Sequence, residues 1–423
     1  MPDQPEARLQ RRALDRAFEV AAAQVADGTA PFVVLGVADS RGVIRLEAVT
    51  SERAPGVGTG SICLLASITK PIVATTVLQL VEAGRFALDV PLGAWLPELE
   101  RPGRLPFTAW HVLSHTTGMD DLDLEELLDA RGPREELLRV AAGLGQDAAP
   151  GNRYHYTSFT FDLLVEAVGR AIGTPFETLL AEGLLGPLGM TDTTFDPRPD
   201  RNGRTAPVAF ARGEDARRAA AHELEHGSSI TDAFTDLHLA GGGLWSTAAD
   251  LLRFGRAMLR GGELDGVRVL SPAFVALATR EVTVNGIGAG PDRQRDDHYA
   301  LGWGKPGVAS PGSPSAFGHG GASGTRLWID PAYDLVYVYL SGDWGLPIQP
   351  IDAVANAIYA AHPGIGWGPT RSTGRPPAGS PPPQTPTSGR ARAIRPRPSR
   401  RSSSGSTCGR GEPSWSWVRA PAS

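Results

Sequence analysis

Apolar residues near the N-terminus recur first at helical spacing and then in short continuous runs. Residues 7–26 carry apolar side chains at intervals of three and four, which predicts an amphipathic helix. Residues 32–38 and 43–49 are apolar, β-branched runs separated by the polar segment 39–42. Two such runs joined by a short polar connection predict a β-hairpin.

The same pattern returns near residue 330. Residues 325–329 and 335–340 are strand-like and flank the turn segment 330–334. Residues 351–361 show helical periodicity again. The segments at both ends therefore predict one antiparallel sheet with helices packed beside it.

The middle of the chain is mostly helical in pattern. Residues 68–83 carry Pro71 in the first turn, where a missing N–H costs little, and residues 163–172 end at Gly173. Thr247-Ala248-Ala249-Asp250 has the form of a capping box before another apolar helix.

These elements together predict an α/β (α+β) fold: an antiparallel sheet built from both termini and flanked by helices, with a mostly helical inserted subdomain. The sheet is expected in about 28–60 and 295–345, and the helical region in about 65–290. Residues 363–423 are rich in Pro, Gly, Ser and Arg and show no periodicity, which predicts a disordered tail after a single domain over residues 1–362. A frameshifted C-terminus is the alternative for this segment.

Charge and targeting signals narrow the function classes. The net charge is -5, and ten Arg against Glu412 give residues 363–423 a charge of +9, which leaves -14 for residues 1–362. An acidic body argues against nucleic acid as the main partner. The first residues have no apolar core typical of a signal peptide, and no run of eighteen apolar residues occurs, so we expect a cytoplasmic protein without a membrane partner. Cys63 and Cys408 are expected to be free thiols.

Lysine is scarce, and one lysine has a notable position. The chain has only Lys70 and Lys305, against 39 arginines, and Lys70 stands three residues after Ser67. A GC-rich genome explains the scarcity but not the position. Ser-x-x-Lys at a helix start places a nucleophile and a base on one face, and the amine of lysine, unlike arginine, loses its proton when buried.

Two further motifs identify a family. Ser67-x-x-Lys70, Tyr156-x-Ser158 and His319-x-Gly321, in this order, resemble the three motifs of the serine β-lactamase and penicillin-binding-protein superfamily. The resemblance is to its class C β-lactamase, DD-peptidase and esterase branch, and it runs from about residue 10 to 361. It implies the β-lactamase/transpeptidase-like fold.

The resemblance also implies roles at the site. Ser67 would attack the substrate carbonyl, and Lys70 with Tyr156 would move the serine proton to the leaving group; which of the two is the base stays open. The backbone N–H groups of Ser67 and Ala322 would form the oxyanion hole. His319 would orient a substrate carboxylate or the Tyr156 hydroxyl. The substrate-binding and oxyanion residues are thus expected to be Ser158, His319, Gly321 and Ala322, with no metal and no cofactor.

Two departures from the family pattern bear on the substrate. Ser158 stands where many β-lactamases of this branch have Asn, and His319-Gly320-Gly321 replaces Lys-Thr-Gly. Both changes weaken efficient β-lactamase action but not acyl transfer. We therefore expect a serine hydrolase that acts through an acyl-enzyme on a small ester or amide, most simply an esterase. The alternatives are a D-amino-acid peptidase or amidase, a weak β-lactamase, and a catalytically silent scaffold of the same fold.

Other chemically suggestive residues are interpreted as structural. His222-Glu223-Leu224-Glu225-His226 matches the H-E-x-x-H zinc motif, which makes a zinc metallopeptidase through His222 and His226 a further alternative, but the polar flanks of the motif favour a surface segment. His115 is expected to tie a loop by hydrogen bonds, and the acidic residues among 120–126 to form a solvated face. Lys305 is expected to be exposed. Aromatic residues suit either an acyl pocket or the core: Phe159, Trp245, Trp303 and Trp344.

Overall fold

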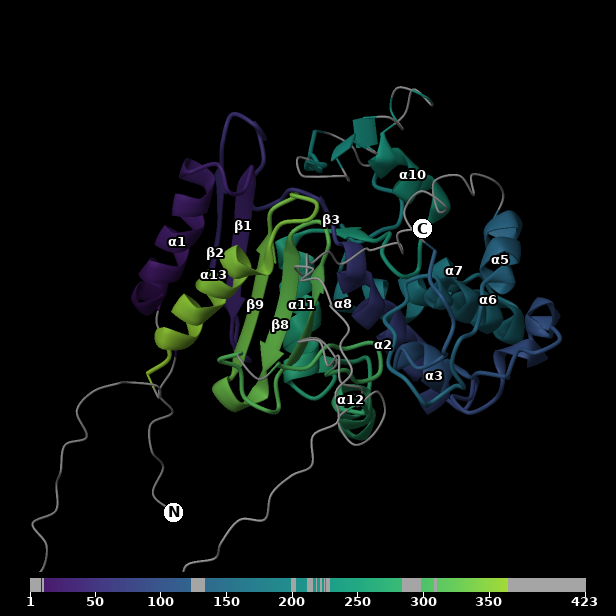
Figure 1. The fold of residues 1–423 in the computed structure, drawn as a ribbon. Helices are drawn as coiled ribbons and strands as arrows, with labels where there is room; N and C mark the ends of the chain where they lie inside the picture. The colour runs from purple at the N-terminus through teal and green to yellow at the C-terminus, as the bar shows by residue number, and fades with distance from the viewer. Residues whose placement is uncertain are drawn as a thin grey trace, which may run out of the picture. The chain divides into compact units, whose positions relative to one another are not determined.

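The computed structural model describes most of the chain up to residue 363 (Figure 1). The described residues are 9, 11–122, 134–198, 203–210, 229–283, 298–307 and 310–363, with single positions between 216 and 225. The predicted tail lies outside them apart from its first residue, so the domain boundary at 362 stays a prediction. His222, His226, Asp123, Glu125 and Glu126 also lie outside the described residues.

A five-stranded antiparallel sheet joins the two ends of the described chain (Figure 1). Val34 lies opposite Leu340, so strands far apart in sequence are direct neighbours. This arrangement confirms the predicted sheet built from both termini. In the order β2-β1-β9-β8-β7, the strands are β2 (Val43–Thr50), β1 (Phe32–Ala38), β9 (Leu335–Leu340), β8 (Thr325–Asp330) and β7 (Phe317–Gly321).

Both faces of the sheet are covered by helices. On one face, Val33 and Leu35 of β1 pack with α1 (Asp15–Ala26) and α13 (Ile348–Ala360), which lie side by side in Figure 1. Val34 points to the other face, toward α11 (Ala248–Leu259). Successive strand residues alternate between the two faces, so a continuous apolar strand is the pattern expected for burial on both sides.

The N-terminal helix is shorter than predicted. Residues 11–14 form a 3-10 turn, and α1 begins at Asp15. The predicted helix end at Gly173 is confirmed, since Gly173 ends α6 (Thr160–Ile172) with a left-handed φ of 74°. The predicted capping box at the start of α11 forms only in part: the Thr247 side chain accepts the Asp250 N–H, but the Asp250 carboxylate accepts from Thr193 and the Asp192 N–H.

The helical region follows the β1-β2 hairpin, and the chain re-enters the sheet at β7. Its longest helix, α2 (Thr69–Glu82), is buried over most of its length. The other helices are α3 (Ala109–Leu113), α5 (Arg134–Gly143), α6, α7 (Phe176–Leu180), α8 (Gly186–Leu188), α10 (Ile230–Leu237) and α12 (Pro272–Thr279), with a π-helical turn at Ala181–Leu185.

Two short strand pairs lie outside the five-stranded sheet. β3 (Cys63–Leu64) pairs with β4 (Trp245–Ser246), and β5 (Glu263–Leu264) pairs with β6 (Val267–Arg268). The first pair fixes the segment that leads into α2. It therefore places the residues of the predicted Ser-x-x-Lys motif relative to residues 241–246.

Candidate active site

Ser67 lies in a tight turn between β3 and α2. Leu65 donates its N–H to the Leu244 carbonyl at 2.8 Å, and Ala66 then takes a left-handed φ of 47°. A non-glycine residue rarely adopts that conformation, so the surrounding contacts must hold it there. The turn leaves Ser67 half-buried, one residue before Ile68 and the first turn of α2.

The Lys70 amine is buried and faces three oxygen atoms. Its Nζ donates to the Gly241 carbonyl at 2.7 Å and lies 3.2 Å from Ser158 Oγ and 3.4 Å from Ser67 Oγ. The Lys70 side chain has no exposed surface. Burial lowers its pKa to about 7, against the opposing effect of the charges of Asp121 and Asp162. An amine near neutrality beside a serine hydroxyl is suited to accept a proton.

Those two carboxylates were not predicted as part of the site. Asp121 accepts the backbone N–H groups of Ser158 at 2.7 Å and Phe159 at 3.0 Å, one on each carboxylate oxygen. Burial raises the pKa of Asp121, while the two N–H bonds and the Lys70 charge lower it. The expectation of a solvated acidic face is therefore wrong for Asp121, because its carboxylate is directed inward; its neighbour Asp120 is exposed.

Asp162 is the second carboxylate. It lies in the first turn of α6, is buried, and accepts the Ala240 N–H at 2.9 Å. The sequence signal for it was weak, since a lone Asp near a helix start is most often a helix-stabilising charge.

The Tyr156 ring lies against the amine of Lys70. Lys70 Nζ is 4.6 Å from the centre of that ring, and the ring centre is 4.3 Å from that of His115 and 6.1 Å from that of His319. All three predicted motifs thus meet around Lys70.

His115 is buried behind Tyr156 and has the structural role predicted for it. Its Nδ1 accepts the Thr157 N–H at 3.1 Å, and its carbonyl accepts the His155 N–H at 2.8 Å. Its Nε2 has no hydrogen-bond partner among the described residues. Burial holds the pKa of His115 well below its ordinary value, so the ring is neutral.

His319 is bonded at both ring nitrogens. Nδ1 lies 2.6 Å from the Gly320 carbonyl, and Nε2 lies 2.9 Å from the Tyr299 hydroxyl. The carbonyl only accepts, so Nδ1 carries the hydrogen and Nε2 accepts from Tyr299. Burial, and then the Lys70 charge, lower the pKa of His319 to about 3. In this arrangement both ring nitrogens are occupied, so His319 has no hydrogen left to donate to a substrate carboxylate; its predicted role, toward a substrate carboxylate or the Tyr156 hydroxyl, stays a prediction.

Tyr299 was not predicted as a site residue from the sequence. It is buried, and burial raises its pKa well above the ordinary value, so its hydroxyl keeps the proton that it donates to His319. No recognisable motif surrounds it, and its part in the site depends on a contact between distant segments.

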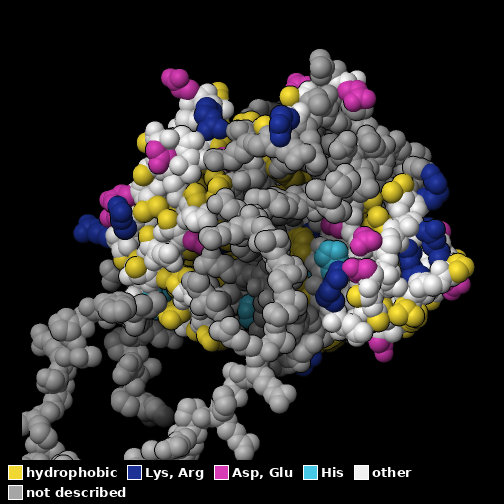
Figure 2. Space-filling model, in the orientation of Figure 1, with side chains coloured by type: hydrophobic (Ala, Val, Ile, Leu, Met, Phe, Trp, Pro, Cys, Tyr) yellow, Lys and Arg dark blue, Asp and Glu magenta, His cyan; other side chains and the backbone are white. Residues whose placement is uncertain are grey.

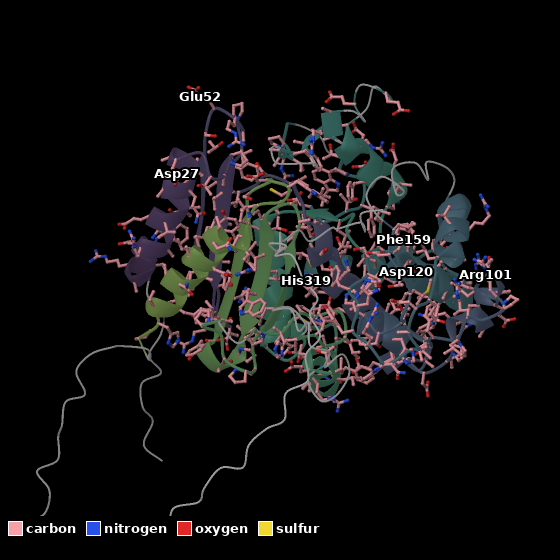
Figure 3. The ribbon with its side chains drawn as sticks, viewed as in Figure 1. Asp27, Glu52, Arg101, Asp120, Phe159 and His319 are labelled. Atoms are coloured by element: carbon pink, nitrogen blue, oxygen red, sulfur yellow. The ribbon has the colours of Figure 1, made fainter. Side chains whose placement is uncertain are left out.

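The end of β7 packs closely on the turn that carries Ser67. A Cβ on Gly321 would lie 2.2 Å from the Leu65 carbonyl oxygen, so only glycine fits there. Just beyond, Ser323 Oγ donates to the Leu64 carbonyl at 2.6 Å and Thr325 Oγ1 to the Leu65 carbonyl at 2.9 Å. Ala322, between these contacts, is half-buried. Figure 3 labels His319 beside the sheet and Phe159 in the helical region.

The remaining predictions have mixed outcomes. Trp303 is fully buried between Phe254 and Phe317, which favours the core interpretation. Lys305 is half-buried with its amine 5.9 Å from the Phe317 ring centre, so the prediction of an exposed Lys305 is wrong. The remaining three aromatic candidates are also buried: Phe159, Trp245 and Trp344.

The surface and the helices bear on the partners predicted from the sequence. On the face drawn in Figure 2, acidic and basic side chains of the described residues are interspersed. Within the part of the chain that the structure describes, no helix combines the length and apolar character needed to cross a bilayer. Of the H-E-x-x-H match, Glu223 and Glu225 are described, and both are exposed.

Comparison with known proteins gives relatives over most of the chain. Protein Rv1367c of Mycobacterium tuberculosis is 32% identical over 323 residues, 65% of this chain and 76% of the relative. Esterase EstB of Burkholderia gladioli is 33% identical over 224 residues, 45% of this chain and 55% of the esterase. The solved structure of EstCE1, a hydrolase with promiscuous acyltransferase activity, has a similar fold, with a TM-score of 0.66 and 20% identity over 82% of this chain and 99% of its own.

The relatives and the fold agree with a match to a family model. The model described as Beta-lactamase matches residues 17–361, which include all three sequence motifs. This match confirms the resemblance predicted from Ser67, Tyr156, His319 and the residues that follow them. The chain belongs to the Beta-lactamase family.

Proposed function

We propose that the protein is a serine hydrolase that forms an acyl-enzyme on Ser67 and acts on small, uncharged esters. The observation that carries the proposal is the buried Lys70 amine, with a pKa of about 7, placed 3.4 Å from Ser67 Oγ. The names of two relatives, an esterase and a hydrolase, support it.

The proposed reaction begins with proton transfer from Ser67 to Lys70. Neutral Lys70 takes the hydroxyl proton as Ser67 Oγ bonds to the ester carbonyl carbon. The proton then passes from Lys70, with Tyr156 as relay, to the departing alcohol oxygen as the ester C–O bond breaks. A water molecule attacks the acyl-enzyme by the same proton path in reverse order, which releases the acid and restores Ser67.

The negative oxygen of the tetrahedral intermediate needs hydrogen-bond donors. In the proposal these are the backbone N–H groups of Ser67 and Ala322. The contact of Gly321 with Leu65 supports this role, because it holds the end of β7 against the turn that carries Ser67.

The preference for uncharged esters rests on the polar groups beside the serine. Ser158 Oγ is already bonded to Lys70, and His319 is neutral with both nitrogens bonded. A carboxylate brought next to them loses water without gaining a permanent cation, because Lys70 must be neutral to act as the base. These features favour an esterase over a β-lactamase or a carboxypeptidase. A cytoplasmic location and the lack of nucleic-acid or membrane partners stay predictions from the sequence.

Labelling of the active serine tests the proposal. Wild-type protein and Ser67→Ala are treated with a fluorophosphonate probe, and hydrolysis of para-nitrophenyl butyrate is measured on the same samples. We expect labelling and turnover in wild type and neither in Ser67→Ala. An unlabelled, inactive wild type indicates the catalytically silent scaffold, and turnover that survives Ser67→Ala but is lost with a chelator indicates the zinc alternative.

A further inference from the structure

Two carboxylates hold the two loops that present oxygen atoms to Lys70. Asp121 binds the N–H groups of Ser158 and Phe159, and the Ser158 hydroxyl accepts from the Lys70 amine. Since both oxygens of Asp121 accept an N–H, the ionised form is the one that satisfies both bonds.

Asp162 fixes the second loop in the same way. It binds the N–H of Ala240, and the next residue, Gly241, gives its carbonyl oxygen to Lys70 at 2.7 Å. The two loops are also in contact, because a Cβ on Gly241 would lie 2.4 Å from the Ser158 carbonyl oxygen. Each carboxylate thus binds the N–H of the residue whose oxygen contacts the amine, or of the residue directly before it.

The charged groups around Lys70 are negative. Asp121, from the loop after α3, and Asp162, from α6, act on the amine with negative charge. Among the described residues, the other titratable groups that face it are the Tyr156 ring before α6, His115 after α3 and His319 on β7. Both imidazoles are neutral, since burial lowers their pKa values. The two carboxylates therefore oppose the effect of burial on the amine.

We propose that Asp121 and Asp162 are positioning residues that set the protonation of Lys70, each by fixing a loop that binds the amine and by supplying negative charge beside it. This inference rests on the proposed function, because the protonation of Lys70 matters to catalysis only if Lys70 accepts the Ser67 proton. Without the carboxylates, the buried amine would be neutral far below pH 7 and a weaker base.

The scarcity of lysine allows a direct test. Full-length protein labelled with ¹³C-lysine has two lysine signals, and Lys305→Arg identifies the one from Lys70. The Lys70 signal is titrated in wild type, Asp121→Asn and Asp162→Asn. Asp120→Asn is the matched control, because Asp120 is the exposed neighbour of Asp121. We expect the titration midpoint to fall by about one pH unit in each single variant and further in the double variant, and to stay unchanged in Asp120→Asn.

Kinetics give a second readout that a purely structural role would not move. In Asp121→Asn the midpoint of the acidic limb of kcat/KM should fall by the same amount as the NMR midpoint. A loss of activity at every pH with an unmoved midpoint, or a Lys70 titration equal to that of wild type, would overturn the inference. The Lys305 signal reports whether each variant is folded. If wild type proves inactive while the Lys70 midpoint moves as expected, the proposed function fails and the electrostatic role stands.

Discussion

The two sides of Ser67 treat charge in opposite ways. The helical side, made by Lys70, Asp121 and Asp162, places an ionisable amine between two carboxylates and a backbone carbonyl. The strand side, made by His319 and the residues up to Ala322 at the end of β7, presents a neutral imidazole and backbone. The difference supports the proposal that proton transfer belongs to the helical side, while the strand side contributes the Ala322 N–H to the oxyanion hole.

Removing the deprotonable amine should have the largest effect on this division. Lys70→Arg keeps a positive charge but cannot lose its proton near neutral pH, so kcat/KM for para-nitrophenyl butyrate should fall about 10³-fold. Lys305→Arg, the same change at the other lysine of the chain, should stay within about twofold of wild type. Near-normal turnover in Lys70→Arg would show that Lys70 does not accept the Ser67 proton.

On the strand side, added bulk should be the most damaging change. Gly321→Ala puts a Cβ within 2.3 Å of Thr325 Oγ1 and closer still to the Leu65 carbonyl, so the end of β7 must move away from Ser67. Loss of one oxyanion donor costs about 10²-fold in kcat, and a drop of that order is expected. Gly320→Ala, whose Cβ meets nothing closer than 3.7 Å, is the comparison variant and should lose far less. Equal effects of the two changes would show that close packing at Gly321 is unimportant.

A matched pair of substrates probes the neutrality of the strand side. Para-nitrophenyl isocaproate and para-nitrophenyl hemisuccinate differ by an isopropyl group in place of a carboxylate of similar shape. Leaving that carboxylate without a partner should cost about 2 kcal/mol, or roughly 30-fold in kcat/KM in favour of the neutral ester. Equal rates on the two esters would mean that a cation reaches the site.

The pH dependence of the wild-type enzyme should show a tenfold effect. Lys70 accepts a proton only when neutral, and its pKa is about 7, so kcat/KM should fall about tenfold per pH unit below pH 7 and level off above pH 8. His319, with a pKa of about 3, stays neutral over this range and adds no limb. Activity that instead declines as the pH rises through 7 would indicate that the ammonium form of Lys70 is the one required.

Much of the sheet was predictable because the apolar character of its strands directly indicates that they are buried. Residues 32–38 and 335–340 are continuously apolar, and both strands are buried along their whole length. The three motifs identified the family for a similar reason, since Ser67, Tyr156 and His319 each stand in a short local pattern. Such signals need no knowledge of distant contacts.

The residues that were missed depend on contacts between distant segments. Asp121 looked like one member of an acidic run, and only the approach of residues 158 and 159 turns its carboxylate inward. Tyr299 gave no signal because its hydrogen-bond partner is 20 residues away on a strand. For His319, sequence reasoning placed the residue but not its charge, which follows from burial and from the two bonds that fix its hydrogen.

The pairing of β1 with β9 has a consequence for biosynthesis. Val34 pairs with Leu340, which is synthesised roughly 300 residues later, so β1 lacks its second neighbouring strand until then. At about 5–20 residues per second on the ribosome, that delay is on the order of 15 to 60 seconds. During this time the β1-β2 hairpin has an unpaired apolar edge, and for most of it β7 has not yet been synthesised. The nascent chain should therefore depend on chaperones that shield this edge, and hydrolytic activity should appear only after residue 340 has left the ribosome.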